Sequence, residues 1–120
     1  MKTRIIAAMD DIFFASKIRG TAEHLNLKVA FVREIDALLE TARHELPGLI
    51  IVDLHARQLD ALALARRLKT DERLRAVPLL GFFSHVQTEL QQSAREAGFD
   101  YVLPRSAFTR RLPEILQGNL

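Results

Sequence analysis

The sequence feature that most constrains the fold is the segment 47–54, which reads Pro-Gly-Leu-Ile-Ile-Val-Asp-Leu. A Pro-Gly turn introduces four consecutive large aliphatic residues, and Asp53 follows them directly. An unbroken aliphatic run of this length is typical of a strand buried on both faces, as in a parallel sheet covered by helices on both sides. The run therefore predicts an open α/β fold. It also places Asp53 at the carboxyl end of a central strand, where such folds bind their ligands.

The rest of the chain alternates between strand patterns and helix patterns. Short apolar runs predict further strands at 4–8, 28–32, 77–83 and 100–103. Apolar residues at helical spacing predict five helices. The first spans 12–25, the second runs from residue 35 and ends before Pro47, and the third follows an N-cap at Asp60. The fourth runs from Val86 to Gly98, and the fifth spans 106–117. Within the last of these, Pro113 lacks a backbone donor, so that helix either kinks or begins afresh at Pro113.

Five strands that alternate with five helices predict a doubly wound, flavodoxin-like parallel sheet with right-handed crossovers. The expected strand order is 2-1-3-4-5, which puts the topological switch point between the first and third strands. Asp10 and Asp11 follow the first of these strands, and Asp53 ends the third. We therefore expect all three carboxylates at one crevice, with Asp10 or Asp11 also serving as a helix N-cap.

Composition narrows the classes of protein to be considered. The 120 residues are enough for one domain (1–120), and the absence of cysteine excludes disulfides, a thiol nucleophile and cysteine zinc sites. The amino terminus resembles neither a signal peptide nor a membrane span, so we expect a cytoplasmic protein without a membrane partner. A net charge of +2 gives no argument for nucleic acid, and the basic cluster at 66–75 is typical of a solvated face.

With these residues placed, the chain resembles a response-regulator receiver domain over nearly its whole length. That family has an acid pair after the first strand, a phosphoacceptor aspartate ending the third, a Ser/Thr ending the fourth, and Lys-Pro after the fifth. The corresponding segments here are Met9-Asp10-Asp11, Asp53, Phe82-Phe83-Ser84 and Pro104-Arg105-Ser106. The runs at 59–62 and 94–100 also resemble family motifs. The resemblance implies a CheY-like (βα)5 fold and a role in phosphorelay signalling of the bacterial two-component type.

Several positions depart from the family pattern. Phe83 falls at the Ser/Thr switch position, and a phenyl ring cannot hydrogen-bond a phosphoryl oxygen. Ser84 would need a register shift to replace it. Arg105 stands in place of the lysine and keeps the charge but not the geometry. A strict count also fills the two acid positions with Met9 and Asp10. Arg57 and Ser106 replace family prolines. These departures indicate an atypical receiver, or pseudo-receiver.

A carboxylate at the end of an apolar strand needs a compensating cation, because burying an unpaired charge is costly. One candidate is Mg²⁺, which the resemblance implies. Its expected ligands are Asp10 or Asp11, Asp53 and the backbone carbonyl of His55. The other candidate is the guanidinium of Arg105, which would pair with Asp53 and fasten the fifth strand to the third.

Histidines and aromatics also gather near the predicted crevice. His55 and His85 are expected close to Asp53, which suggests a metal-dependent enzyme or a small α/β hydrolase, although no H-x-x-x-H spacing supports either. Four phenylalanines are expected near one end of the sheet: Phe13, Phe14, Phe82 and Phe83. We take from them the hypothesis of a hydrophobic plug over the crevice in place of a phosphate pocket.

The favoured interpretation is a stand-alone receiver-like signalling module, not an enzyme, which has a degenerate phosphorylation site and acts by protein–protein contact. A histidine kinase or another signalling protein would be its partner. The alternative is an orthodox phosphorelay protein, phosphorylated on Asp53 with Mg²⁺, in which Ser84 and Arg105 perform the switch. A homodimer through the fourth helix, the fifth strand and the last helix is a further expectation from the resemblance.

Overall fold

The computed structural model describes residues 4–120, so the start of the amino-terminal segment, residues 1–3, lies outside the described part of the chain. The strands are β1 (Arg4–Ala8), β2 (Lys28–Val32), β3 (Leu49–Asp53), β4 (Leu79–Phe83) and β5 (Tyr101–Pro104). The helices are α1 (Ile12–His24), α2 (Ile35–His44), α3 (Ala61–Lys69), α4 (Thr88–Ala97), α5 (Arg105–Arg110) and α6 (Leu112–Leu116). Within residues 4–120, no helix is long and apolar enough to cross a membrane.

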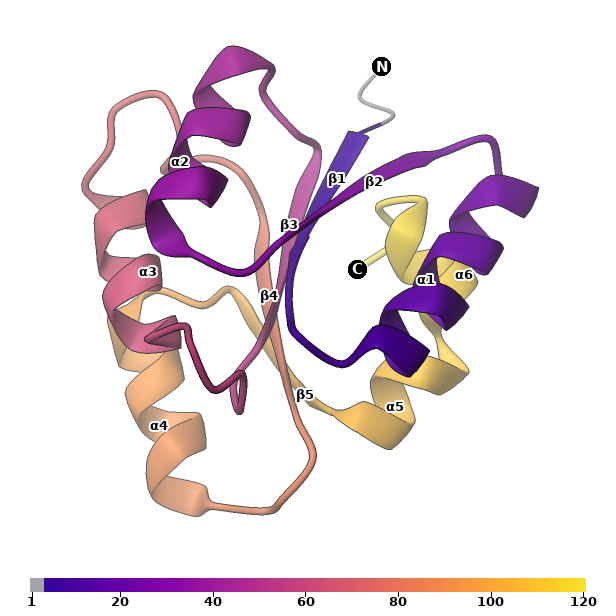
Figure 1. Cartoon of the computed structure of the whole chain (residues 1–120). Coiled ribbons are helices and arrows are strands. Elements are labelled where there is room, and N and C mark those ends of the chain that lie inside the picture. The colour runs from indigo at the N-terminus through magenta and orange to yellow at the C-terminus, as the bar shows by residue number, and fades with distance from the viewer. Residues whose placement is uncertain (1–3) are drawn as a thin grey trace.

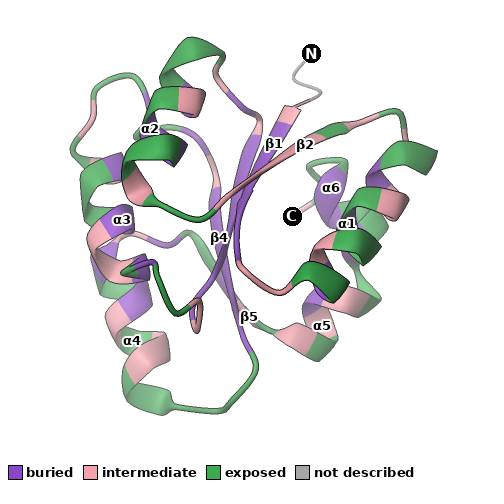
Figure 2. Cartoon of the chain, viewed as in Figure 1, coloured by how far each residue is buried: buried purple, intermediate pink, exposed green. Residues whose placement is uncertain are grey.

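The five strands form one parallel sheet in the order β2-β1-β3-β4-β5, as predicted. Helices α2, α3 and α4 cover one face, and α1, α5 and α6 cover the other (Figure 1). Every residue of β3 is buried, and the buried residues concentrate along the central strands (Figure 2). Helices thus cover both faces of the sheet, as predicted. Asp53 lies at the carboxyl end of β3, as predicted.

Side-chain alternation along β3 serves both layers of the core. Ile50 and Val52 pack in the layer with α2, α3 and α4, whereas Leu49 and Ile51 pack in the layer with α1, α5 and α6. Continuing the alternation, Asp53 belongs to the second layer. The aliphatic run therefore folds as expected for a strand that is buried on both faces.

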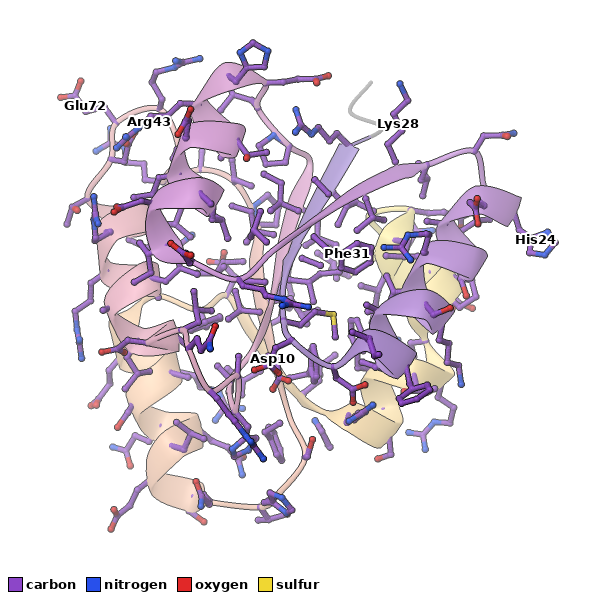
Figure 3. The ribbon with its side chains drawn as sticks, viewed as in Figure 1. Asp10, His24, Lys28, Phe31, Arg43 and Glu72 are labelled. Carbon is purple, nitrogen blue, oxygen red and sulfur yellow. The ribbon has the colours of Figure 1, made fainter. Side chains whose placement is uncertain are left out.

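Asp11, rather than Asp10, is the N-cap of α1. Its Oδ1 accepts hydrogen bonds from the backbone N–H groups of Phe13 and Phe14, each at 3.0 Å. These bonds satisfy two of the donors that a helix leaves free at its amino end. Asp10 precedes the cap and remains free for other contacts at the sheet edge, where β1 leads into α1 (Figure 3).

The structure corrects several predicted element boundaries. Strand β4 begins at Leu79 rather than at residue 77, and β5 covers Tyr101–Pro104, one residue later than predicted at each end. The prediction that the fourth helix begins at Val86, with this residue on its apolar face, is wrong, because Val86 lies in the loop before α4 and is 80% exposed. Gly98 ends α4 with φ of +124°, a backbone conformation that favours glycine.

The predicted last helix is two helices. Helix α5 ends at Arg110, and α6 begins at Leu112 with Pro113 in its first turn. Of the two outcomes predicted for Pro113, a fresh start is thus the correct one, since proline is well tolerated at the beginning of a helix. The second start lets both short helices contribute to the same layer, through Phe108 from α5 and Ile115 from α6.

Candidate functional site

Asp53 is a buried carboxylate at the carboxyl end of the central strand. Only 7% of the residue is exposed, and its Oδ1 accepts a hydrogen bond of 2.9 Å from the backbone N–H of His55. Burial raises the pKa of Asp53 above its ordinary value, because desolvation penalises the charged form. The His55 N–H and the charges of His55 and Arg105 oppose this shift, and the Asp10 charge adds to it.

Asp10 is the acid that influences Asp53. Its Oδ2 accepts a hydrogen bond of 3.1 Å from the backbone N–H of Arg57, which connects the β1–α1 turn to the segment after β3. Its negative charge also raises the pKa of Asp53, because a neighbouring like charge disfavours ionisation. The sequence prediction that the ends of β1 and β3 meet at one crevice is therefore correct for this pair.

Arg105 pairs with Asp11 and not with Asp53. Its Nη2 lies 3.1 Å from Asp11 Oδ2, and its guanidinium sits over the Phe14 ring, 4.0 Å from the ring centre. The expected Arg105–Asp53 ion pair is therefore wrong, since no ion pair to Asp53 is present in residues 4–120. The physical reason is local. Asp11 is held in place as the N-cap of α1, and its carboxylate lies beside the start of α5, whose first residue is Arg105.

Asp11 therefore has a structural role, as the N-cap of α1 and the ion-pair partner of Arg105. The Phe14 backbone N–H does most to lower the pKa of Asp11, and the hydrogen bond and charge of Arg105 lower it further. Both of its carboxylate oxygens are occupied, one by the helix cap and one by the guanidinium. The sequence makes Asp11 a candidate metal ligand, and these contacts compete with that role.

The phenylalanines at the end of β4 divide between the two core layers. Phe82 pairs in register with Asp53 and is fully buried, stacked on Phe108 at 5.0 Å and edge-on to Phe14 at 5.3 Å. Phe83, only 5% exposed, packs in the opposite layer. Phe14 and Phe82 thus belong to the packed core on the Asp53 side of the sheet, so the hypothesis of a plug over the crevice stays untested for them, and it is wrong for Phe83. It is also wrong for Phe13, which is 84% exposed.

Ser84 lies in the bend after β4 and is exposed. Within residues 4–120 its hydroxyl makes no hydrogen bond to another residue. The backbone N–H of His55 donates to Asp53, and the rings of His55 and His85 lie 5.5 Å apart at 73°, whereas the closeness of His85 to Asp53 stays a prediction. Nε2 of His55 is a buried atom without a hydrogen-bond partner in the described chain, and neither ring donates to the Asp53 carboxylate there.

The side chains present suit a hard, partly hydrated cation better than a transition metal. No group of three His, Cys, Asp or Glu side chains in residues 4–120 is placed to hold an ion. Mg²⁺, however, is commonly bound by one or two carboxylates together with water. If such an ion bound here, Asp10 and Asp53 would offer it two carboxylates, and the His55 backbone carbonyl would be the third expected ligand. Zinc would require nitrogen or sulfur ligands in a closed set.

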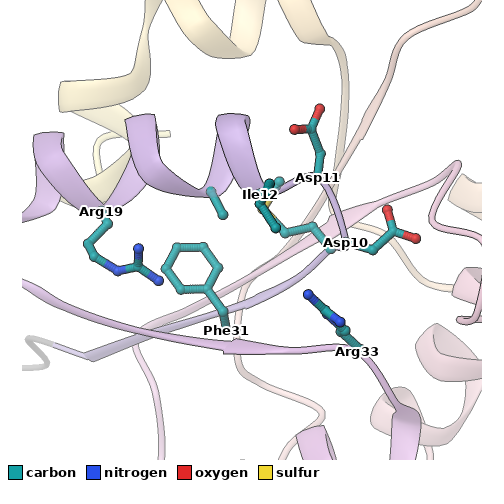
Figure 4. Close-up of a pocket in the computed structure, with 8 residues that line it drawn as sticks. Asp10, Asp11, Ile12, Arg19, Phe31 and Arg33 are labelled. Atoms are coloured by element: carbon teal, nitrogen blue, oxygen red, sulfur yellow. The ribbon is translucent and has the colours of Figure 1, made fainter.

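Sequence reasoning missed a set of cationic and aromatic side chains beside Asp10. Arg33 follows β2 directly, Arg19 extends from α1, and Phe31 lies between them, lining a cavity next to the acidic turn (Figure 4). A signal was available for Arg33, because β2 neighbours β1 in the predicted order and its carboxyl end reaches the same sheet edge. None was available for Arg19, whose place depends on the rotation of α1.

Neither a family model nor a curated protein matches the sequence. Solved structures do match the fold. A response regulator from Hahella chejuensis has a TM-score of 0.86 at 17% identity, covering 98% of this chain and 95% of its own. The chemotaxis response regulator CheY4 of Vibrio cholerae has a TM-score of 0.84 at 17% identity, with 100% of both chains covered. The Mn²⁺-bound response regulator Rcp1 has a TM-score of 0.76 at 15% identity, covering 97% and 90%. The fold of the chain is thus that of a response-regulator receiver domain.

Proposed function

We propose that the chain is a receiver-like signalling module with a degenerate phosphorylation site, which acts through contact with a protein partner and not as an enzyme. The observation that carries the proposal is the state of the switch position. Phe83 is buried in the core layer with α3 and α4, and its ring offers no hydroxyl to a phosphoryl group on Asp53. The exposed Ser84 one residue later does not compensate, since it lies beyond the end of the strand.

The position of Arg105 supports the same conclusion. A phosphorylated Asp53 would gain from a cation that moves to meet it. Arg105 is instead held by the Asp11 carboxylate and by the Phe14 ring, so recruiting it would break an ion pair and a cation–π contact. Arg105, the basic side chain best suited to meet a phosphoryl group, is therefore already held in structural contacts.

Protein contact is favoured by the apolar side chains around the same sheet edge. Ile12 and Phe13 at the start of α1 are 63% and 84% exposed, and Val86 in the β4–α4 loop is similarly exposed. Large apolar side chains left in water at the rim of a site are typical of an interaction surface. We propose that a histidine kinase or another signalling protein binds this rim. Dimerisation through α4, β5 and α5 stays a prediction, with Tyr101 as the exposed aromatic on that face.

The alternative function is an orthodox phosphorelay protein phosphorylated on Asp53 with Mg²⁺. Its support is the buried, unpaired Asp53 carboxylate with Asp10 nearby, an arrangement that a divalent cation would stabilise. The structural neighbour Rcp1 was solved with Mn²⁺ bound. When bound here, such an ion would neutralise negative charge between the two acids. An enzyme built on Asp53, His55 and His85 has less support, because within residues 4–120 neither imidazole ring forms a hydrogen bond to the Asp53 carboxylate.

Intact-mass measurement separates the two functions. The chain is incubated with acetyl phosphate and Mg²⁺, beside an orthodox receiver as a positive control and Asp53→Asn as a negative one. The proposal expects the mass of the chain to stay unchanged while the control gains one phosphoryl group. A gain that depends on both Mg²⁺ and Asp53 would establish the alternative.

A further inference from the structure

The cavity between α1 and β2 has the composition of a ligand site. Its volume is about 260 Å³, and its walls include Met9, Asp10, Ile12, Arg19, Phe31 and Arg33. Pockets for small organic ligands are typically apolar with a few converging polar groups, and this volume suits a small member of that class. Phosphorylation of Asp53 plays no part in this site, so ligand binding in the cavity is independent of the proposed function.

Two guanidinium groups give the cavity an excess of positive charge. Arg33 extends from the end of β2 toward the acidic turn, and Arg19 reaches in from α1 (Figure 4). Neither forms an ion pair with any acid in residues 4–120. Asp11 also borders the cavity, but Arg105 already neutralises it. One carboxylate, Asp10, is thus left opposite two guanidinium groups, which matches a ligand with a single negative charge.

An aromatic platform adjoins this charge. Arg19 lies over the Phe31 ring, with its guanidinium carbon 4.8 Å from the ring centre. Met9, Ile12 and Ala15 supply the remaining apolar wall. An inorganic anion would leave these side chains in contact with water, and a divalent one would be repelled by Asp10. A planar organic monoanion can pair with the guanidinium groups and bury its ring against Phe31 at the same time.

We propose that the α1–β2 cavity binds a small planar organic monoanion, an aromatic carboxylate in chemical class. The carboxylate pairs with Arg33 and Arg19, and the ring packs against the apolar wall that Phe31 shares with Met9, Ile12 and Ala15. Because guanidinium groups form bidentate pairs with carboxylates, both arginines contribute to affinity as well as to orientation.

The test is a titration of the ¹⁵N-labelled chain with benzoate, followed by NMR. Saturable shifts are expected at the backbone amides of Ala15, Phe31 and Arg33. Arg19→Gln and Arg33→Gln should each weaken binding roughly 10-fold. Both arginines are exposed, so these variants should keep the folded spectrum. The matched control Arg95→Gln, on α4 at the other face of the sheet, should bind as the wild type does.

Two further probes separate the contribution of the ring from that of the charge. Acetate carries the charge without the ring, and benzamide carries the ring without the charge, so both should bind at least about 10-fold more weakly than benzoate. The proposal is overturned if benzoate gives no saturable shifts, if acetate binds as well as benzoate, or if the two arginine variants bind benzoate with unchanged affinity.

Discussion

Arg105 and Asp11 lie 94 positions apart in the sequence and form an ion pair of 3.1 Å at the mouth of the site. This pair connects the start of α5 to the N-cap of α1, and it leaves Asp53 without a basic partner in residues 4–120. The same contact therefore stabilises the fold at the sheet edge and withdraws the cation that a phosphorylated aspartate would need.

Replacing Asp11 should lower the free energy of unfolding through two separable contributions, the helix cap and the Arg105 ion pair. Asp11→Ala removes both the helix cap and the Arg105 pair, and the expected loss is about 1–2 kcal/mol in the free energy of unfolding. Asp11→Asn can still cap α1 and loses only the charge, so its loss should be smaller, under about 1 kcal/mol for a half-exposed pair. Urea denaturation at pH 7 measures both. Equal losses would show that the cap contributes nothing.

The Asp11 contribution should also depend on pH. Its folded-state pKa is lowered, so the charged form stabilises the fold at any pH above the ordinary aspartate value. That stability is lost as the pH falls through the ordinary value toward the folded-state pKa. The difference between wild type and Asp11→Asn should therefore be full at pH 7 and shrink in acid. A difference that grows in acid would contradict the assigned direction.

Asp53 should behave in the opposite way. Its folded-state pKa is raised by burial, so the folded chain holds a proton more tightly than the unfolded chain, and stability falls as the pH rises through that raised value. Deprotonation of the buried Asp53 carboxyl group therefore destabilises the fold, and Asp53→Asn, which has no such proton to lose, should raise Tm at pH 7 by roughly 2–6 °C. Asn Oδ1 can still accept the His55 N–H. The gain should disappear as the pH falls below the ordinary aspartate pKa of 3.8, as followed by circular dichroism, and a lower Tm of the variant at pH 7 would count against this account.

Mg²⁺ should stabilise the chain only when both nearby acids are present. If Asp10 and Asp53 hold the ion, 10 mM Mg²⁺ should raise the Tm of the wild type by about 1–3 °C through mass action. Asp10→Asn and Asp53→Asn should each abolish the effect, whereas Asp36→Asn, a surface acid of α2, should retain it. A shift of equal size in all four proteins would instead indicate a general effect of ionic strength.

Phe83 should prove to be a core residue. Phe83→Thr leaves a cavity in the layer with α3 and α4, and the expected loss is about 3 kcal/mol in the free energy of unfolding. The matched variant Phe83→Leu keeps the layer apolar and should lose less than half as much. Chemical denaturation measures both changes. A neutral Phe83→Thr would show that the ring is not part of the packed core.

The fold was predictable because its strongest signals are local. The aliphatic run before Asp53 identifies a strand buried on both faces, and the alternation of strands and helices leaves few topologies. Pro113 likewise limited the last helix to a kink or a fresh start, because a helix accommodates proline at few positions, and the structure has the fresh start. The prediction for Val86 fails because this residue continues the apolar spacing of α4 while lying before the first helical residue.

The partners of the charged side chains were not predictable from local signals. Arg105 was within topological reach of both Asp11 and Asp53, and its choice depends on where α5 begins relative to the α1 cap. Strand alternation explains why Phe83 is buried on the face of the sheet opposite to Asp53. The exact end of β4, however, determines that Ser84 lies outside the strand and is exposed. Such choices depend on the exact placement of the elements in three dimensions, which the spacing of residues in a sequence does not encode.

A degenerate phosphorylation site is tested most directly by the response of Asp53 to beryllofluoride, which mimics a phosphoryl group on a receiver aspartate. The ¹⁵N-labelled chain is titrated with beryllofluoride in the presence of Mg²⁺, and the amides of Asp53, His55 and Ser84 are followed by NMR. We expect these resonances to match those seen with Mg²⁺ alone. Saturable shifts at these three amides that are absent in Asp53→Asn would contradict a degenerate site and establish a working phosphoacceptor.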